Sequence, residues 1–287
     1  MPSNQIQWFP GHMAKTRRLI TENLKNVDAV IELLDARIPT SSRNPEITKL
    51  TAGKPKIILL NKASLADQSK TALFREKYSG EDTVCIETDC ISGSGLNKIA
   101  PSIRELCREK LERYEDKGMS GRMLKAMVLG IPNVGKSSLI NKICGSKKAK
   151  VENRPGVTLD KQWVATNIGI LLLDMPGILW PKFEDPTVGE NLALTGAIKD
   201  DILDVESLAC VLCSRLREMY PELLSARYKI GEPTEYSELS DYELLSLVGK
   251  KRGFLVSGGE INTERAANML LDEFRAAKIG RITLDKI

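Results

Sequence analysis

Residues 130–137, with the sequence GIPNVGKS, constrain the fold of this chain more than any other segment. An apolar run with β character at 124–129 precedes them, and a helical pattern follows at 138–144. This order of strand, glycine-rich turn and helix is the context in which G-x-x-x-x-G-K-[ST] forms a phosphate-binding loop. Gly130 and Gly135 let backbone N–H groups turn inward at the positive N-terminus of the helix. The sequence therefore predicts a phosphate-binding loop inside an α/β fold.

Polar residues within and after this loop are candidates for contacts with phosphate and metal. We expect Lys136 to reach the β and γ phosphates, and the Ser137 hydroxyl to bind Mg²⁺. Farther along, an apolar strand pattern ends in Asp174, and Gly177 follows with the spacing D-x-x-G. Asp174 is expected to hold Mg²⁺ through water, while the Gly177 amide contacts the γ-phosphate and is released when it leaves. Thr158, in the polar, basic segment between these motifs, is predicted to complete the Mg²⁺ shell as part of a first switch.

A candidate guanine-binding sequence lies before the phosphate-binding loop. A buried-strand pattern at 56–60 runs into Asn61-Lys62-Ala63-Ser64, where guanine-nucleotide proteins have N-K-x-D. In that pattern the Asn contacts the purine, the Lys stem covers the base, and the Asp accepts hydrogen bonds from two guanine N–H groups. Because a single hydroxyl at Ser64 cannot accept both protons as a carboxylate does, base discrimination is expected to weaken.

A second candidate for base recognition follows the next strand pattern, at 83–87. Asp89 and Cys90 come directly after it and lead into a Gly/Ser-rich turn. Backbone N–H groups there are expected to face the purine carbonyl. The motifs thus run in the order guanine box, base loop, phosphate loop, first switch, second switch, which is a circular permutation of the usual small GTPase order.

This order, together with four further segments, closely resembles the family of ribosome biogenesis GTPase A, the YlqF-type permuted bacterial GTPases. The segments that carry the resemblance are Trp8-Phe9-Pro10-Gly11-His12-Met13, Asp35-Ala36-Arg37-Ile38-Pro39, the loop from Arg154 to Thr158, and Pro176-Gly177-Ile178-Leu179-Trp180-Pro181. The resemblance spans nearly the whole chain. It implies a GTP hydrolase that binds GTP and GDP, contacts the immature large (50S) ribosomal subunit through rRNA and ribosomal proteins, and acts late in assembly.

The resemblance also implies roles for particular residues in catalysis. It implies potassium-assisted hydrolysis, with Asn133 as the K⁺ ligand. Ile178 stands where many GTPases have a water-orienting Gln, and the resemblance transfers this role to His12, the one histidine of the chain. A neutral imidazole can accept a hydrogen bond from attacking water. With catalytic Lys136, the full set predicted to contact nucleotide is Asn61, Lys62, Ala63, Ser64, Asp89, Cys90, Asn133, Val134, Gly135, Lys136, Ser137, Ser138 and Gly177.

Alternating β and α patterns predict a mostly parallel sheet with helices on both faces, followed by an all-helical part. We expect an N-terminal basic helix and motif at 1–26, a permuted GTPase domain at 27–184, and a helical RNA-binding domain at 185–287. One long helix is expected at 96–114, with an exposed linker at 115–122. Cys210 and Cys213 are expected to be buried free thiols rather than zinc ligands.

Charge and hydropathy favour an RNA-binding protein without membrane contact. The net charge is only +4, but basic residues gather in three places: Lys15, Arg17, Arg18 and Lys25; Lys142, Lys147, Lys148, Lys150, Arg154 and Lys161; and Lys250, Lys251, Arg252, Arg275, Lys278 and Arg281. Such clusters favour a surface for a polyanion. Because no apolar run approaches the ~20 residues that span a bilayer and no signal-peptide pattern is present, we expect a soluble, cytoplasmic monomer.

Two other functions are compatible with the residues. Ser64 also permits a P-loop ATPase or a small-molecule kinase, although no apolar run after the phosphate loop ends in Asp-Glu. A nucleotide-regulated RNA-binding protein with weak guanine selectivity is the other alternative, in which nucleotide has a structural role. Nucleotide selectivity and turnover distinguish these alternatives from a GTPase.

Overall fold

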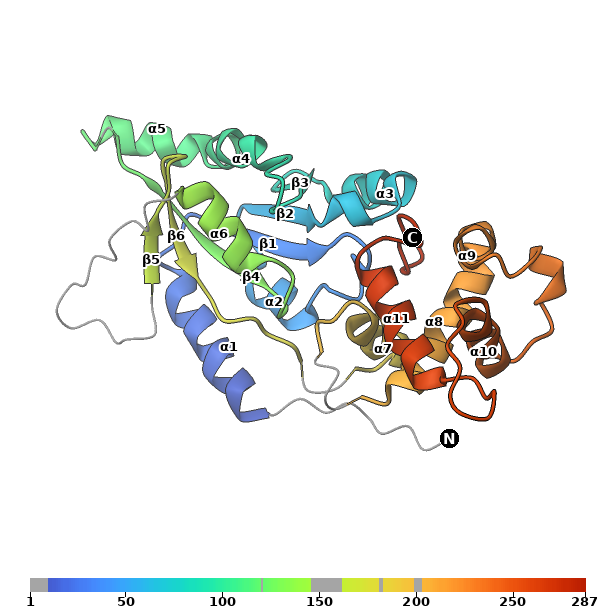
Figure 1. The fold of residues 1–287 in the computed structure, drawn as a ribbon. Coiled ribbons are helices and arrows are strands. Elements are labelled where there is room, and N and C mark those ends of the chain that lie inside the picture. The colour runs from blue at the N-terminus through green and yellow to red at the C-terminus, as the bar shows by residue number, and fades with distance from the viewer. Residues whose placement is uncertain (1–9, 120, 146–161, 181–182, 199–202) are drawn as a thin grey trace.

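A six-stranded sheet with helices on both faces forms the larger part of the computed structural model, and a group of helices packs beside it (Figure 1). The structure describes residues 10–119, 121–145, 162–180, 183–198 and 203–287. The strands are β1 (Ala29–Asp35), β2 (Lys56–Asn61), β3 (Thr83–Glu87), β4 (Leu124–Gly130), β5 (Gln162–Ala165) and β6 (Ile170–Asp174), in the spatial order β3-β2-β1-β4-β6-β5. All neighbours are parallel except β5 and β6. The predicted fold class is confirmed.

The order of the strands places a ligand crevice between β1 and β4. From β1 the chain moves outward to β2 and β3, then crosses back to the opposite side of β1 to form β4. In open α/β sheets, ligands bind beyond the carboxyl ends of the strands where the direction of winding reverses. The phosphate-binding loop follows β4, and the charged pair Asp35 and Arg37 ends β1. Both therefore lie at this reversal point.

Each strand contributes alternate residues to opposite faces of the sheet. Ile31 and Leu33 of β1 belong to the same apolar cluster as Leu139 of the helix after the phosphate-binding loop. Val30 packs instead with Ile20 of the N-terminal helix. The helices of this part are α1 (Pro10–Leu24), α2 (Pro45–Leu50), α3 (Gln68–Tyr78), α4 (Ile99–Leu106), α5 (Arg108–Asp116) and α6 (Lys136–Cys144), with short 3-10 turns η1 (Ala63–Leu65) and η2 (Leu96–Lys98).

The structure divides the single helix predicted at 96–114. After η2, α4 ends at Leu106, and a separate α5 begins at Arg108. The break lies at Cys107, whose side chain is buried and whose ψ of 17° departs from helical geometry. The bend lets Lys110 pair with Asp28 at 2.6 Å. The predicted linker also starts later than expected, because α5 continues to Asp116.

The C-terminal helices pack around one central helix. They are α7 (Pro186–Leu194), α8 (Val205–Met219), α9 (Pro221–Tyr228), α10 (Asp241–Lys251) and α11 (Thr263–Arg275), with η4 (Pro233–Glu235). Leu212 and Leu216 of α8 are fully buried, as are Leu245 of α10 and Leu270 of α11. Asn262 caps α11 by accepting from the Arg265 amide.

The last residues return from the helices to the sheet. The Asp285 carboxylate accepts hydrogen bonds from the backbone amides of Thr40 and Ser41 at 2.6 and 2.8 Å, and from Asn191 of α7 at 3.0 Å. Arg281 donates to the carbonyls of Ala63 and Ala66, both at 2.8 Å. The chain after α11 therefore ties the helical part to the segments that follow β1 and β2.

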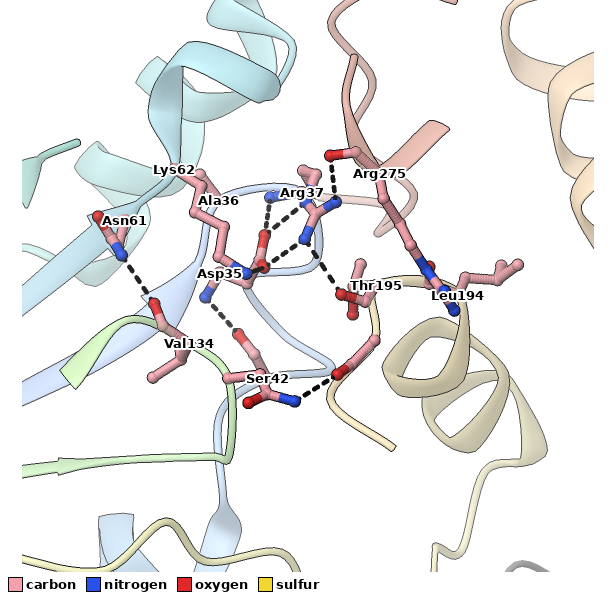
Figure 2. A network of polar contacts seen from close by, with 12 residues as sticks. Asp35, Ala36, Arg37, Ser42, Asn61, Lys62, Val134, Leu194, Thr195 and Arg275 are labelled. Atoms are coloured by element: carbon pink, nitrogen blue, oxygen red, sulfur yellow. Dashed lines mark hydrogen bonds and ion pairs between the residues drawn. The ribbon is translucent and has the colours of Figure 1, made fainter. Parts of the chain in front are cut away.

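A buried ion-pair network makes a second connection (Figure 2). Asp35 at the end of β1 binds the Arg37 guanidinium through both oxygens, at 3.0 and 2.8 Å, and binds Lys62 at 2.9 Å. Arg37 also donates to the carbonyls of Thr195 and Arg275, at 3.3 and 3.5 Å. Burial alone would raise the pKa of the Asp35 carboxyl, but the cations of Arg37 and Lys62 outweigh it and hold the pKa well below its usual value.

We expect Arg37→Ala to lower the free energy of unfolding by about 3–5 kcal/mol, because it leaves the Asp35 carboxylate buried without its bidentate partner. Urea denaturation measures the change. The matched control is Arg113→Ala, which removes an exposed pair with Glu109 and should cost about 0.5 kcal/mol or less. Equal effects of the two variants would contradict a stabilising role for the network.

Candidate functional site

The phosphate-binding loop adopts a backbone conformation that requires its glycines. Gly130 has a φ of 154°, and a Cβ there would lie 2.8 Å from the Leu33 carbonyl of β1. Gly135 has a φ of 109° and caps the N-terminus of α6. The loop borders a cavity of about 710 Å³, which is lined by Pro132, Asn133, Gly135, Lys136, Ser137, Ser138, Asp174, Met175, Pro176 and Gly177. The predicted phosphate loop and second switch therefore share one cavity.

Lys136 lies within this loop and is poised for an anion. Its Nζ donates to the carbonyls of Gly130 and Ile131, at 3.1 and 2.8 Å. Burial lowers the pKa of Lys136 to about 8, although the nearby Asp174 carboxylate opposes this shift. A phosphate anion at the loop would stabilise the charged amine and raise that pKa again.

The second switch closes the other side of the cavity. A Cβ on Gly177 would lie 2.9 Å from Pro132 and 3.0 Å from Lys136 Nζ, so only glycine lets the backbone approach the loop so closely. Ser137 and Asp174 face the same cavity and supply a hydroxyl and a carboxylate oxygen. Oxygen donors of this kind suit Mg²⁺, because this ion retains several water molecules in its coordination shell and needs only a few ligands from the protein. These two residues therefore fit the ion.

The guanine box docks directly on the phosphate-binding loop. Asn61 is buried, and its Nδ2 donates to the Val134 carbonyl at 2.7 Å, while its Oδ1 accepts from the Cys90 amide at 3.0 Å. A Cβ on Gly135 would lie 2.3 Å from Asn61 Nδ2, so the glycine makes room for the amide. One side chain therefore holds the guanine box, the base loop and the phosphate loop together. The sequence pattern indicated a contact with the purine but not this positioning role.

A second cavity, of about 320 Å³, lies on the base side of the loop. It is lined by Arg37, Asn61, Lys62, Ser64, Leu65, Asp89, Cys90, Ile91, Asn133, Gly135, Ser138, Thr195 and Arg275. It shares Asn133, Gly135 and Ser138 with the phosphate cavity. The two cavities therefore adjoin and form a trough that runs from the guanine box to the second switch.

Several residues that were predicted to contact nucleotide or metal either bind other parts of the protein or lie outside the residues that the structure describes. Asn133 donates to the Gly196 carbonyl at 2.8 Å, a bond that does not use the Oδ1 atom that would bind K⁺. Ala63 contributes its carbonyl to Arg281. His12 lies in the first turn of α1, but its side chain is outside the described atoms. Thr158 lies outside the described residues.

The structure adds two residues without a predicted role, Asp35 and Arg37. The sequence analysis used them only as part of a resemblance. Their position at the end of a buried strand beside the phosphate-loop strand is the signal that identifies them. Asp35 holds Lys62, and Arg37 lines the base cavity (Figure 2). Both therefore shape the site.

The described residues include the cysteines predicted to be free thiols, and the findings on metal clusters and membrane spans concern the same residues. No group of three or more His, Cys, Asp or Glu side chains there could hold a metal ion. Cys213 is buried and Cys210 half-buried, and both are free thiols on α8. Within the same residues, no helix has the length and apolar character to cross a bilayer.

Comparison with known proteins gives consistent matches. The model of the 50S ribosome-binding GTPase family matches residues 125–227, so the guanine box and base loop lie before the matched segment. Ribosome biogenesis GTPase A of Bacillus licheniformis is 46% identical over 98% of this chain and 98% of its own length. Mitochondrial ribosome-associated GTPase 1 of Xenopus tropicalis is 34% identical over 97% of this chain and 94% of its own. The crystal structure of GNP-bound YlqF from T. maritima has a TM-score of 0.60 at 25% identity and covers 95% of this chain and 98% of its own.

Nucleotide affinity should fall as pH rises above about 8, because the Lys136 ammonium must be present to bind phosphate and burial lowers its pKa to about 8. Between pH 7 and 9 we expect GDP to bind about tenfold more weakly, since each unit above the pKa reduces the protonated fraction about tenfold. Titration calorimetry should also show proton uptake above pH 8. Lys136→Arg stays charged and should lose this dependence. An affinity that is constant over this range would contradict the assignment.

Proposed function

This chain belongs to the ribosome biogenesis GTPase A family, and we propose that it binds the immature large ribosomal subunit in the cytoplasm and hydrolyses GTP late in assembly. The observation that carries the proposal is the docking of Asn61 on Val134, which joins the guanine box to the phosphate-binding loop. That contact makes one nucleotide site from two segments that lie 73 positions apart in the chain.

The residues of the trough have separate tasks in hydrolysis. Backbone amides of the loop and the N-terminus of α6 hold the β and γ phosphates, and Lys136 compensates their charge. Ser137 and Asp174 would hold Mg²⁺, which neutralises charge as the terminal phosphate leaves. The backbone of Gly177 lies beside the phosphate-binding loop. Loss of the γ-phosphate removes the contact between this phosphate and the Gly177 amide, and the second switch is then released.

Activation of the attacking water requires a group outside the second switch. Ile178 is apolar and buried, and its amide bonds to the Gly130 carbonyl at 3.2 Å. It therefore cannot orient water. We assign this task to His12 at the start of α1, and K⁺ bound through Asn133 would add positive charge near the phosphates. Because His12 precedes the exposed Lys15, Arg17 and Arg18 in α1, binding of this helix to RNA would bring the histidine into position.

Exposure and contacts within the protein separate the basic residues that are available to RNA from those that are not. Lys15, Arg17 and Arg18 are exposed along α1, whose Ile20 packs against the sheet, and Lys25 is exposed directly after the helix. Lys250 and Lys251 are exposed at the end of α10. Three other basic residues bind the protein itself, because Arg252 pairs with Glu273 and both Arg275 and Arg281 donate to backbone carbonyls. We therefore propose α1 and the end of α10 as the surfaces that contact rRNA.

The nucleotide site is connected to the helical part by direct contacts. Lys62 of the guanine box binds Asp35, which holds Arg37 against the Thr195 carbonyl. Asn133 of the phosphate loop reaches the neighbouring Gly196 carbonyl. A change in nucleotide can thus move residues 195–196, at the end of α7, and with them the helices that carry part of the RNA surface.

GTP turnover should be slow for the isolated protein and faster with large-subunit particles, because docking is needed to place the water-orienting group. Phosphate release is measured with and without particles, in K⁺ and in Na⁺. We expect the highest rate with particles in K⁺, and a loss of about 100-fold in nucleotide affinity for Lys136→Ala. Equal rates with and without particles would contradict the proposal. ATP turnover equal to GTP turnover would favour the ATPase alternative.

His12→Ala should reduce particle-stimulated turnover by about 10²- to 10⁴-fold, the usual contribution of a general base, while GDP affinity stays unchanged. Lys15→Ala removes a nearby exposed charge and serves as the control. It should weaken particle binding but keep turnover at saturating particle concentration. Full stimulated turnover by His12→Ala would exclude this histidine as the water-orienting group.

A further inference from the structure

The residue that replaces the guanine-box carboxylate contacts another carboxylate. Ser64 follows β2 and Asp89 follows β3, and the two strands are parallel neighbours, so their carboxyl ends lie side by side. The Ser64 hydroxyl donates a hydrogen bond to Asp89 Oδ2. We propose that Asp89 supplies the carboxylate that reads guanine in this chain, with Ser64 as its positioning partner and second acceptor. The proposal rests on the proposed function, because it assigns base recognition within the same site.

Asp89 has a fixed orientation in the base loop. Its Oδ1 accepts hydrogen bonds from the amides of Ile91 and Ser92, at 3.0 and 2.9 Å. Its backbone amide donates to the Ser94 carbonyl at 3.0 Å, and its carbonyl accepts from the Gly93 amide at 2.7 Å. With Oδ1 held by the loop, the other oxygen, Oδ2, faces Ser64. The carboxylate is thus preorganised rather than free to rotate.

The number of acceptor positions matches guanine. A carboxylate accepts about four hydrogen bonds, and Asp89 uses two at Oδ1 and one at Oδ2. One position at Oδ2 remains. The Ser64 oxygen has donated its proton and retains two lone pairs. Two neighbouring acceptors therefore face the cavity, as the N1–H and N2–H groups of guanine require, whereas adenine presents an unprotonated ring nitrogen and a C–H at that edge.

Asp89 is ionised under ordinary conditions. Burial alone would raise the pKa of its carboxyl, but hydrogen bonds from the Ser64 hydroxyl and from the Ser92 and Ile91 amides outweigh it and lower the pKa. Ser64 is exposed and Asp89 half-buried, so both remain accessible to a ligand. Among the described residues that line the base cavity, Asp89 is the one acid.

The other nearby acid has a structural task. Asp67 caps α3 by accepting from the Ser69 and Lys70 amides, at 2.9 and 3.2 Å. Its second oxygen accepts from the Tyr220 hydroxyl at 3.2 Å. It does not line the base cavity. Asp67 therefore cannot take the place of the missing guanine-box carboxylate.

Asp89→Asn tests the proposal with little change in shape. The amide oxygen can keep the bonds from Ile91 and Ser92, which directs the NH₂ group toward Ser64 and the base. A donor then replaces the acceptor. GDP affinity should fall by about 10- to 100-fold, the range for a hydrogen bond to a charged group. Xanthosine diphosphate, which has a carbonyl in place of the 2-amino group, should gain affinity.

The binding of GDP, xanthosine diphosphate and ADP is measured for the wild type, Asp89→Asn, Ser64→Ala and the control Asp67→Asn. ADP affinity measures binding of the diphosphate to the phosphate-binding loop, so it should be the same in the wild type and in all variants. Ser64→Ala should lower GDP affinity less than Asp89→Asn, and Asp67→Asn should leave the ratio of GDP to xanthosine diphosphate affinity unchanged. The double variant Ser64→Asp/Asp89→Asn returns a carboxylate to the guanine box and should recover the preference for GDP.

The possible outcomes separate this proposal from the proposed function. A wild type that prefers GDP to ADP, with the same GDP to xanthosine diphosphate ratio in Asp89→Asn, would overturn the role of Asp89 and leave the GTPase function intact. A wild type that binds ADP as well as GDP would overturn both. A preference that shifts toward xanthosine diphosphate in Asp89→Asn alone, with normal thermal melting, supports the assignment.

Discussion

The amide of Asn61 is the contact on which the rest of the site depends. It joins Val134 of the phosphate-binding loop to Cys90 of the base loop, and Gly135 leaves space for it. A buried amide whose donor and acceptor are both used fixes the relative position of the groups it joins, because breaking either bond leaves a polar group unpaired. The permuted order of the chain is therefore compatible with a GTPase site: spatial adjacency at the carboxyl ends of the strands replaces sequence order.

The site is supported from the side of the helical part. Asp35 joins Lys62 to Arg37, and Arg37 binds the carbonyl of Thr195 (Figure 2). A buried ion pair is costly unless its geometry is good and further hydrogen bonds satisfy its atoms. Here the pairing is bidentate and carbonyl oxygens accept additional Arg37 protons. The network thus couples the position of Lys62 to the end of α7.

Sequence predicted the parts of this structure that depend on local pattern. The strand at 83–87 and the loop at 130–137 agree because apolar periodicity and turn chemistry determine them. The break at Cys107 was missed, since no Gly or Pro marks it and the burial of Cys107 becomes visible only in the fold. Weaker base discrimination from Ser64 stays a prediction, but the hydrogen bond of Ser64 to Asp89 was missed, because Asp89 follows a different strand and only the fold brings the two together. Likewise, the basic residues after α10 indicated a binding surface, but several bind carbonyls or Glu273 within the protein.

The strap formed by residues 281–285 has a consequence for biosynthesis. Arg281 and Asp285 hold the segments after β2 and β1, which the ribosome makes more than 200 residues earlier. Because domains form as the chain emerges, a nascent polypeptide can pair its strands well before these supports arrive. The segments after β1 and β2 thus receive these supporting hydrogen bonds only when translation is nearly finished.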